Sequence, residues 1–404
     1  MKIAFVSGLY PPAIIGGAEI VLQTLVEGIR DRGHEVLVLT TKQGGSIERD
    51  LVNDVPVIRV PIKNIYWHGV KDARKQWKKV IWHAMDSVNL PMVSIARAIL
   101  KDERPDAVNV HVIEGWSAAV LASSKSLGIP TVQVLHSANF LCPNSNMFRN
   151  GRNCAGQCIS CKVLRVAHRS LSNNADAVVG VSQFVLNRHL AAGYFSRAKH
   201  RVAFHSARDL CPADLEASSR RASGGQNFVF GFIGNISPAK GVSVLLDEFR
   251  SMSDTGSELW VAGSGESRYE AELKSRYSNP RIRFLGYQKQ ADFFPNIDVL
   301  IVPSLCEEAL GMVVPEAFAF SLPVIAAKRG GIPEMVEDGR NGRLFEPENK
   351  GELKAIMTRF LRGEEDLEGM QLAAKDSARQ YLDTGCWVDK YIQLNSEVIA
   401  SRGN

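Results

Sequence analysis

Two carboxylates with seven residues between them, Glu308 and Glu316, are the side chains of this sequence with the clearest chemical potential. The residues that follow Glu316 are apolar, which predicts a buried helix, and buried acids usually have a partner or a function. If Gly311 opens that helix, the amides of Leu310, Gly311 and Met312 point toward an anion. One carboxylate could then hold a sugar hydroxyl and the other a ribose. The alternative is a loop acid followed by an acid on a helix face.

Three glycine turns that follow predicted strands are the second group of candidates. Gly16 and Gly17 open the first helix, where glycine lets the backbone approach an anion closely. The turn that contains Asn235 ends with Lys240, whose ammonium could bind a phosphate. Gly263 follows another strand of the same half and would line the same edge. Each feature has a plainer alternative, a tight turn or a solvated lysine.

The elements that must position these residues alternate between strand and helix, which indicates parallel sheets covered by helices. In the first half the predicted elements are strands at 2–7, 35–40, 55–61, 106–111, 131–136 and 175–181, and helices at 18–32, within 71–101, at 116–127 and at 183–192. A polar stretch, Leu210–Gln226, is the predicted linker. A second alternating set then begins at Asn227. The predicted fold class is therefore α/β, with two similar Rossmann-like domains.

The expected domains are 1–208, 209–385 and a C-terminal helix, 386–404, that crosses back to the first domain. Ligands of open α/β sheets bind outside the carboxyl ends of the strands, so two such domains facing each other would form a ligand cleft. The halves also differ in charge: up to Phe204 there are 25 Lys and Arg against 14 Asp and Glu, and beyond it 23 against 29. We therefore expect the two domains to have different partners.

Composition excludes several classes of protein. The chain has 404 residues, of which 45% are hydrophobic and 23% charged, as in folded globular proteins rather than disordered ones. No apolar run reaches the ~18–20 residues that span a membrane, and the N-terminus lacks the features of a secretory signal. We expect a cytoplasmic protein, in which stable disulfides are uncommon.

The sequence resembles the family 4 (GT4) retaining glycosyltransferases, which have the GT-B fold of two Rossmann-like domains facing across a cleft. The resemblance spans nearly the whole chain. It rests on the loop Gly16-Gly17-Ala18-Glu19, the Glu308-x7-Glu316 motif, and the segments Gly330-Gly331-Ile332-Pro333-Glu334 and Glu337-Asp338-Gly339-Arg340-Asn341-Gly342. Its implied activity is transfer of a sugar from a nucleoside diphosphate sugar, with UDP or GDP as the expected nucleotide.

The resemblance also implies a role for each matched residue. Glu316 would hold the ribose hydroxyls and Glu308 a sugar hydroxyl near the reacting centre. Lys240 would hold the diphosphate, beside the amides of residues 310–312, and Gly17 would approach it from the first domain. No catalytic metal is expected.

His136, which ends the strand Thr131–Leu135, matches the family histidine that contacts the donor sugar. The alternative is a structural histidine. The family acceptor, a glycan or a lipid-linked or small molecule, would bind mainly to the first domain.

The sequence departs from the family pattern at the phosphate loop. Asn235 stands where the family usually has an arginine, which removes one charge that would neutralise phosphate. Leu310 replaces the usual aromatic residue. Two rival hypotheses stay open: an epimerase or phosphorylase on the same fold, and, because of Asn235, a non-catalytic protein that binds nucleotide sugars.

Four cysteines lie within the loop 140–162, with the spacing C-x11-C-x3-C-x2-C: Cys142, Cys154, Cys158 and Cys161. Four thiolates can close a tetrahedral Zn²⁺ site and order a loop that has no core of its own. An iron–sulfur cluster also takes four cysteines, but this spacing is not a standard one. The alternative is a set of reduced thiols. The loop is expected to overhang the acceptor side.

A basic and aromatic stretch, 63–82, combines six Lys and Arg with three Trp. As an amphipathic helix it would suit an anionic membrane surface, which the family resemblance also implies. The alternative is a solvated helix with its tryptophans in the core. No nucleic-acid partner is expected, because no recognition fold accompanies the charge.

Overall fold

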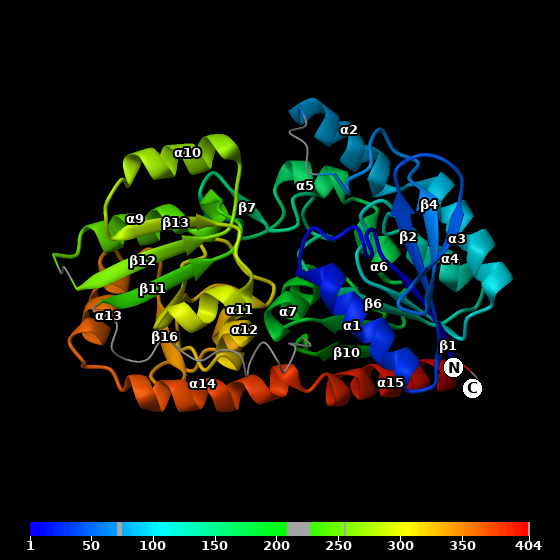
Figure 1. The fold of residues 1–404 in the computed structure, drawn as a ribbon. Helices are drawn as coiled ribbons and strands as arrows, with labels where there is room; N and C mark the ends of the chain where they lie inside the picture. Colours follow the sequence, from blue (N-terminus) through cyan, green and yellow to red (C-terminus); the bar gives the residue numbers. More distant parts are fainter. Residues whose placement is uncertain (71–74, 208–226, 254–255, 403–404) are drawn as a thin grey trace. The chain divides into compact units, whose positions relative to one another are not determined.

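The computed structural model describes residues 1–70, 75–207, 227–253 and 256–402 (Figure 1). The predicted linker and two of the basic residues, Lys71 and Arg74, lie outside these ranges. The chain divides into two compact units. Unit 1 comprises Met1–Met147, Cys154–Ala207 and Asp383–Asn404, and unit 2 comprises Phe148–Asn153 and Arg208–Leu382.

The described part of unit 1 is built on an eight-stranded sheet with the order β10-β9-β6-β5-β1-β2-β4-β3. The strands are β1 (Lys2–Val6), β2 (Glu35–Lys42), β3 (Glu48–Val52), β4 (Val55–Pro61), β5 (Ala107–Val110), β6 (Thr131–Leu135), β9 (Ala177–Gly180) and β10 (His200–Ala203). All neighbours pair in parallel except β3, which runs antiparallel to β4 at the edge. β1, β5, β6 and β9 are buried along nearly their whole length, as expected for parallel strands covered on both faces.

Helices connect these strands. They are α1 (Gly17–Asp31), α2 (Gln76–Ser87), α3 (Leu90–Glu103), α4 (Val120–Ser126), α5 (Ile159–Leu164), α6 (His168–Ser172), α7 (Gln183–Ala191) and α15 (Thr384–Ala400). In α1 the buried residues recur at helical spacing, so one apolar face packs on the core. The last helix, α15, packs against α1, and buried Asn395 accepts a hydrogen bond from Asn109 of β5 at 2.7 Å.

In unit 2 the described residues form a six-stranded, fully parallel sheet with the order β13-β12-β11-β14-β15-β16. Its strands are β11 (Phe228–Ile233), β12 (Ser257–Ala262), β13 (Ile282–Gly286), β14 (Val299–Val302), β15 (Val324–Ala327) and β16 (Gly342–Phe345). The main helices are α9 (Val242–Arg250), α10 (Ser267–Arg276), α11 (Gln290–Phe293), α12 (Val313–Ala319), α13 (Glu352–Leu361) and α14 (Leu367–Leu382). The core joins the sheet to the apolar faces of α9 and α13. Two parallel-sheet, Rossmann-like domains are thus confirmed.

Some elements differ from the sequence-based expectation. The helical region within 71–101 is two helices, because Val88 is extended and Asn89 caps α3 by accepting a hydrogen bond from the amide of Met92. Residues 148–153, expected in the first domain, form a hairpin of β7 (Phe148–Arg149) and β8 (Arg152–Asn153) that groups with unit 2. No helix among the described residues is long and apolar enough to cross a membrane.

Candidate active site

The order in which the chain adds strands to the sheet of unit 2 reverses between β11 and β14. Most of the donor-binding residues predicted from the sequence lie in the loops near this point. From β11 the chain moves outward through β12 to β13, whereas β14 leads the other way to β15 and β16. The loops after β11 and β14 therefore leave adjacent strands at the same edge of the sheet. Such a switch point is where open α/β sheets bind ligands.

Lys240 and Glu308, one from each of these loops, form an ion pair. The Lys240 Nζ lies 2.6 Å from Glu308 Oε1, and the hydroxyl of Ser304 donates to the same oxygen at 2.6 Å. Burial alone would lower the pKa of Lys240, but the Glu308 carboxylate outweighs it and raises that pKa above its usual value. The site therefore holds a charged ammonium in direct contact with the Glu308 side chain.

The backbone fixes these two loops against each other. The amides of Leu305 and Cys306 both donate to the carbonyl of Ala239, at 2.9 and 3.0 Å. At Gly241 an added Cβ would lie 1.8 Å from the carbonyl oxygen of Pro303, so only glycine fits there. The Lys240–Glu308 pair is thus built on a rigid backbone junction.

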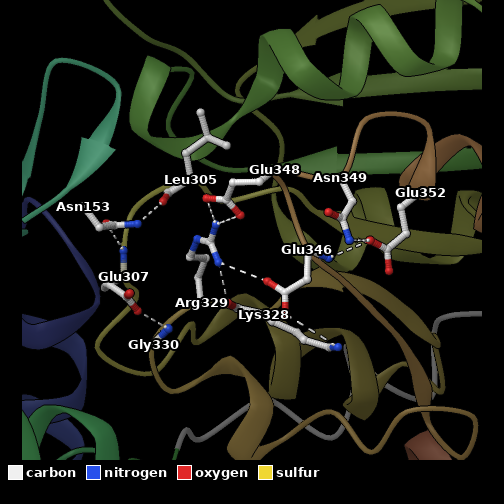
Figure 2. Close-up of polar contacts among 10 residues, drawn as sticks. All are labelled: Asn153, Leu305, Glu307, Lys328, Arg329, Gly330, Glu346, Glu348, Asn349 and Glu352. Atoms are coloured by element: carbon white, nitrogen blue, oxygen red, sulfur yellow. Dashed lines mark hydrogen bonds and ion pairs between the residues drawn. The ribbon is translucent and has the colours of Figure 1, made fainter. Parts of the chain in front are cut away.

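The turn after β15 holds the Glu308 loop from another side (Figure 2). The carboxylate of Glu307 accepts a hydrogen bond from the Gly330 amide at 2.6 Å, and the Gly331 amide donates to the Glu308 carbonyl at 2.9 Å. An added Cβ at Gly330 would lie 1.9 Å from that same carbonyl oxygen. The glycine pair of the family segment therefore serves close packing against the Glu308 backbone.

Arg329 anchors this turn in place. Its side chain is only 10% exposed and pairs with Glu348, and more distantly with Glu346 at 3.6 Å (Figure 2). Both acids come from the segment after β16. The turn that supports Glu308 is therefore tied to the neighbouring strand connection by a largely buried guanidinium.

Glu316 lies in α12 and is 4% exposed. Gln290 of α11 donates to its Oε2 at 3.1 Å. The helix begins at Val313, two residues later than expected, because Gly311 adopts a positive φ of +92° that ends the preceding loop. Leu310, Gly311 and Met312 therefore lie in the turn before α12, and their role toward an anion stays a prediction.

The turn at Gly263 lies directly against the turn at Gly234. An added Cβ at Gly263 would be 1.8 Å from the Gly234 carbonyl oxygen, which explains the glycine. Asn235 follows in this turn and is exposed. Asn235 and Gly263 therefore lie at one edge of the sheet, as expected from the sequence.

In unit 1 the loop after β1 is closed by Glu19. Its Oε2 accepts a hydrogen bond from the Gly16 amide at 2.8 Å, and burial raises the pKa of this carboxyl. The carboxylate thus caps the N-terminus of α1, which begins at Gly17. An approach of Gly16 and Gly17 to a ligand remains a prediction.

His136, at the end of β6, is paired with a second histidine. Its Nε2 lies 2.9 Å from Nδ1 of His111, and the two rings stack at 5.1 Å. Burial lowers the pKa of His136 to about 4 and holds that of His111 well below its usual value. The pair is therefore neutral, with one shared N–H···N hydrogen bond.

His111 was not among the residues singled out from the sequence, although it ends its predicted strand in the same way as His136 does. Its Nε2 is buried without a hydrogen-bond partner among the described residues. Which of the two histidines donates in their shared N–H···N bond depends on their tautomers.

The cysteine loop brings thiols together but holds no preformed metal site. The thiol of Cys161 is in hydrogen-bonding contact with those of Cys158 and Cys142, and burial raises the pKa of Cys161 to about 12. None of the four cysteines of the loop is in a disulfide. Within the described ranges no group of three or more His, Cys, Asp or Glu has the arrangement of a metal site.

Comparison with known families covers both halves of the chain. Residues 16–204 match the family described as glycosyl transferase 4-like domain, and residues 227–363 match glycosyl transferases group 1. The two matches contain the loop at Gly16-Gly17 and both carboxylates, Glu308 and Glu316.

Individual proteins agree with these matches. The chain is 27% identical to a 42.6 kDa protein of the cps region of Klebsiella pneumoniae, over 83% of this chain and 87% of that one. It is 23% identical to the alpha-D-kanosaminyltransferase of Streptomyces kanamyceticus, over 85% and 89% of the two chains. A crystal structure of Anabaena HepE in complex with UDP superposes with a TM-score of 0.72 at 21% identity, over 98% of this chain and all of that one.

Proposed function

The chain is a glycosyltransferase of family 4 with the GT-B fold, and from this premise we propose that it transfers a sugar, with retention of configuration, from a UDP- or GDP-sugar to a glycan, lipid-linked or small acceptor. The observation that carries the proposal is the Lys240–Glu308 ion pair at the switch point of unit 2, with buried Glu316 in the same motif. HepE, which has the same fold, was also solved with UDP-glucose.

A bound nucleoside diphosphate sugar would separate Lys240 from Glu308. Its diphosphate competes with Glu308 for the ammonium of Lys240. The released Glu308 carboxylate then accepts a hydrogen bond from a sugar hydroxyl, while Glu316 holds the ribose hydroxyls. The cation lies where negative charge grows as the nucleotide departs, which is the electrostatic stabilisation that speeds such a transfer.

The transfer exchanges one bond to the anomeric carbon for another. The bond from this carbon to the diphosphate oxygen breaks, and a bond to the acceptor oxygen forms on the same face. The acceptor proton passes to the departing diphosphate, so no side chain is needed as base. His136 would hold a hydroxyl of the transferred sugar.

A direct test supplies UDP-, GDP-, ADP- and TDP-sugars with an acceptor panel and follows the products by proton NMR. We expect release of one nucleoside diphosphate and a new glycoside with the anomeric configuration of the donor. An inverted product would contradict retention. An epimerised nucleotide sugar or a free sugar phosphate would instead support an enzyme of another class.

We also propose that the four cysteines hold a structural Zn²⁺. Four thiols in one short loop are a donor set that zinc prefers, and three of them already meet around Cys161. Metal binding would tighten this group and order the loop. Elemental analysis of the purified protein should then find about one zinc per chain, and Cys158→Ser should lose it. A zinc and iron content near zero would favour reduced thiols.

Finally, we propose that unit 1 associates with anionic membranes. Trp82 is buried, but Trp77 of α2 is 56% exposed beside the exposed Lys75, Lys78 and Lys79. Helix α5 packs against α2 and adds two exposed apolar residues one turn apart, Ile159 at 83% exposure and Val163, and the exposed Val166 follows in the turn after this helix. Basic residues beside exposed apolar ones suit an anionic bilayer surface.

Sedimentation with vesicles tests this surface. The protein should sediment with phosphatidylcholine vesicles that contain phosphatidylglycerol and much less with phosphatidylcholine alone. Ile159→Ser combined with Val163→Ser should weaken the binding, and so should neutral replacements at Lys75, Lys78 and Lys79. Equal sedimentation of all variants would contradict the surface.

A further inference from the structure

A hairpin inside the cysteine loop touches the donor-site loop of unit 2. Asn150 and Gly151 both have positive φ, at +51° and +75°, as a two-residue type I′ turn requires. Phe148 pairs with Asn153 and Arg149 with Arg152 across the hairpin. Successive side chains of a strand point to opposite faces, so Asn153 and Arg152 face opposite ways.

Asn153 makes two hydrogen bonds to the backbone of the loop that leads into Glu308 (Figure 2). Its side-chain nitrogen donates to the carbonyl of Leu305 at 2.7 Å, and its side-chain oxygen accepts from the amide of Glu307 at 3.0 Å. The primary amide thus acts as both donor and acceptor, as a neighbouring strand would. It satisfies two backbone groups in a segment that has no strand partner of its own.

The same loop is held on its other side by the Gly330 turn. The Glu307 carboxylate accepts from the Gly330 amide, and Arg329 fixes that turn to Glu348. Glu307 is therefore fixed through its amide by Asn153 and through its carboxylate by Gly330. Because Glu308 is the next residue, these contacts define the direction of the backbone from which its carboxylate reaches Lys240.

We infer that Asn153 is a positioning residue for Glu308, which couples the hairpin to the donor-binding loop; this inference rests on the proposed function. Catalytic groups must be held near their productive geometry, and a small displacement of the supporting backbone lowers the rate. Asn153 hydrogen-bonds to the Leu305 carbonyl and the Glu307 amide of this loop, so it acts through the backbone that leads to Glu308. Binding of a donor should become less favourable when the Glu308 loop has more than one conformation.

Side-chain replacements separate the two hydrogen bonds. Asn153→Ala removes both bonds, and Asn153→Asp keeps the acceptor for the Glu307 amide but loses the donor to Leu305. Arg152→Ala is the matched control, because Arg152 is exposed, lies next to Asn153 and faces away from the loop. We expect kcat/KM for the donor to fall about tenfold in Asn153→Ala, less in Asn153→Asp, and not in Arg152→Ala.

Hydrogen exchange at residue level gives a readout that does not depend on activity. The Glu307 amide should exchange faster in Asn153→Ala, stay protected in Asn153→Asp, and match the parent protein in Arg152→Ala. Unchanged exchange in Asn153→Ala would overturn the inference, and so would faster exchange with unchanged kcat/KM. If the parent protein transfers no sugar, the proposed function fails, and exchange together with affinity for UDP and GDP still decides whether Asn153 positions this loop.

Discussion

At the scale of single residues, the central feature is a cation and a carboxylate in direct contact, which we propose that a bound diphosphate would separate. Lys240 and Glu308 come from loops that follow different strands, and their 2.6 Å contact is reinforced by Ser304. A diphosphate can replace Glu308 at the ammonium because both are anions. The sequence suggested both residues but not their mutual pairing, which depends on the order of strands in the sheet.

The role assigned to Glu308 predicts a loss of turnover without a loss of donor binding. Glu308→Gln keeps the shape of the side chain but removes the charge next to the reacting sugar. We expect kcat to fall by about 100-fold or more, and the dissociation constant of the nucleoside diphosphate to stay the same or decrease, because the carboxylate no longer competes for Lys240. Glu337→Gln, an exposed acid of the same unit, is the control in steady-state kinetics. Near-parent turnover in Glu308→Gln would reject the assignment.

Replacement of Asn235 by arginine should strengthen the binding of the nucleoside diphosphate. This residue is exposed at the edge where the Gly234 and Gly263 turns meet, and it stands where the family usually has arginine. Asn235→Arg adds a cation beside the proposed diphosphate. We expect three- to tenfold tighter binding of the nucleoside diphosphate in calorimetric titrations at low salt, and a smaller gain at high salt. Weaker binding would place the diphosphate elsewhere.

At the scale of elements, the Gly330 turn shows how a loop contact sets the site. Gly330→Ala would force a Cβ to within 1.9 Å of the Glu308 carbonyl, whereas Gly363→Ala meets no atom within 4 Å. Both glycines have positive φ, +59° and +68°, so the backbone strain of the two substitutions is matched. We expect Gly330→Ala to lower kcat by ~30-fold or more and Gly363→Ala to change only stability. Equal kinetics in the two variants would contradict the supporting role of the turn.

Helices and strands could be predicted from the sequence where apolar residues recur at helical spacing or form a short continuous run, as in α1, β6 and β12. The hairpin at 148–153 was not predicted, although Asn150-Gly151 is the dipeptide that a type I′ turn favours. Its strands have two residues each and no apolar alternation, so periodicity gives no signal. Its contact with Leu305 and Glu307 joins segments about 150 residues apart, and such a contact depends on tertiary structure.

At the scale of the whole molecule, titratable groups are distributed unevenly. All nine histidines of the sequence lie at or before residue 205. Burial lowers the pKa of seven of them: to about 3 or 4 in His68, His83, His136, His168 and His189, well below the usual value in His111, and below the usual value in His34. The acid stability of the two units should therefore differ.

This distribution predicts acid unfolding that begins in unit 1. Below about pH 6.5 the histidines of the unfolded chain bind protons, whereas the buried histidines of the folded chain stay neutral. The free energy of unfolding therefore falls as the pH drops toward 4. Asp86, whose pKa burial raises to about 8, acts in the opposite sense and offsets only part of the loss. Calorimetry should show a melting temperature more than about 10 °C lower at pH 4.5 than at pH 7.5. Acid-induced exchange that starts in unit 2 would contradict this prediction.

From the parallel sheet of unit 2 and its pair of carboxylates we propose that this unit binds a nucleoside diphosphate sugar through Lys240, Glu308 and Glu316. The most direct test is calorimetric titration of UDP, GDP, ADP and TDP and their common sugars into the parent protein and into Glu316→Ala, with Glu316→Gln as the variant that preserves side-chain volume. We expect selective binding of one nucleotide, weakened about tenfold or more in Glu316→Ala. No binding by any member of the panel, or equal affinity in parent and variant, would contradict it.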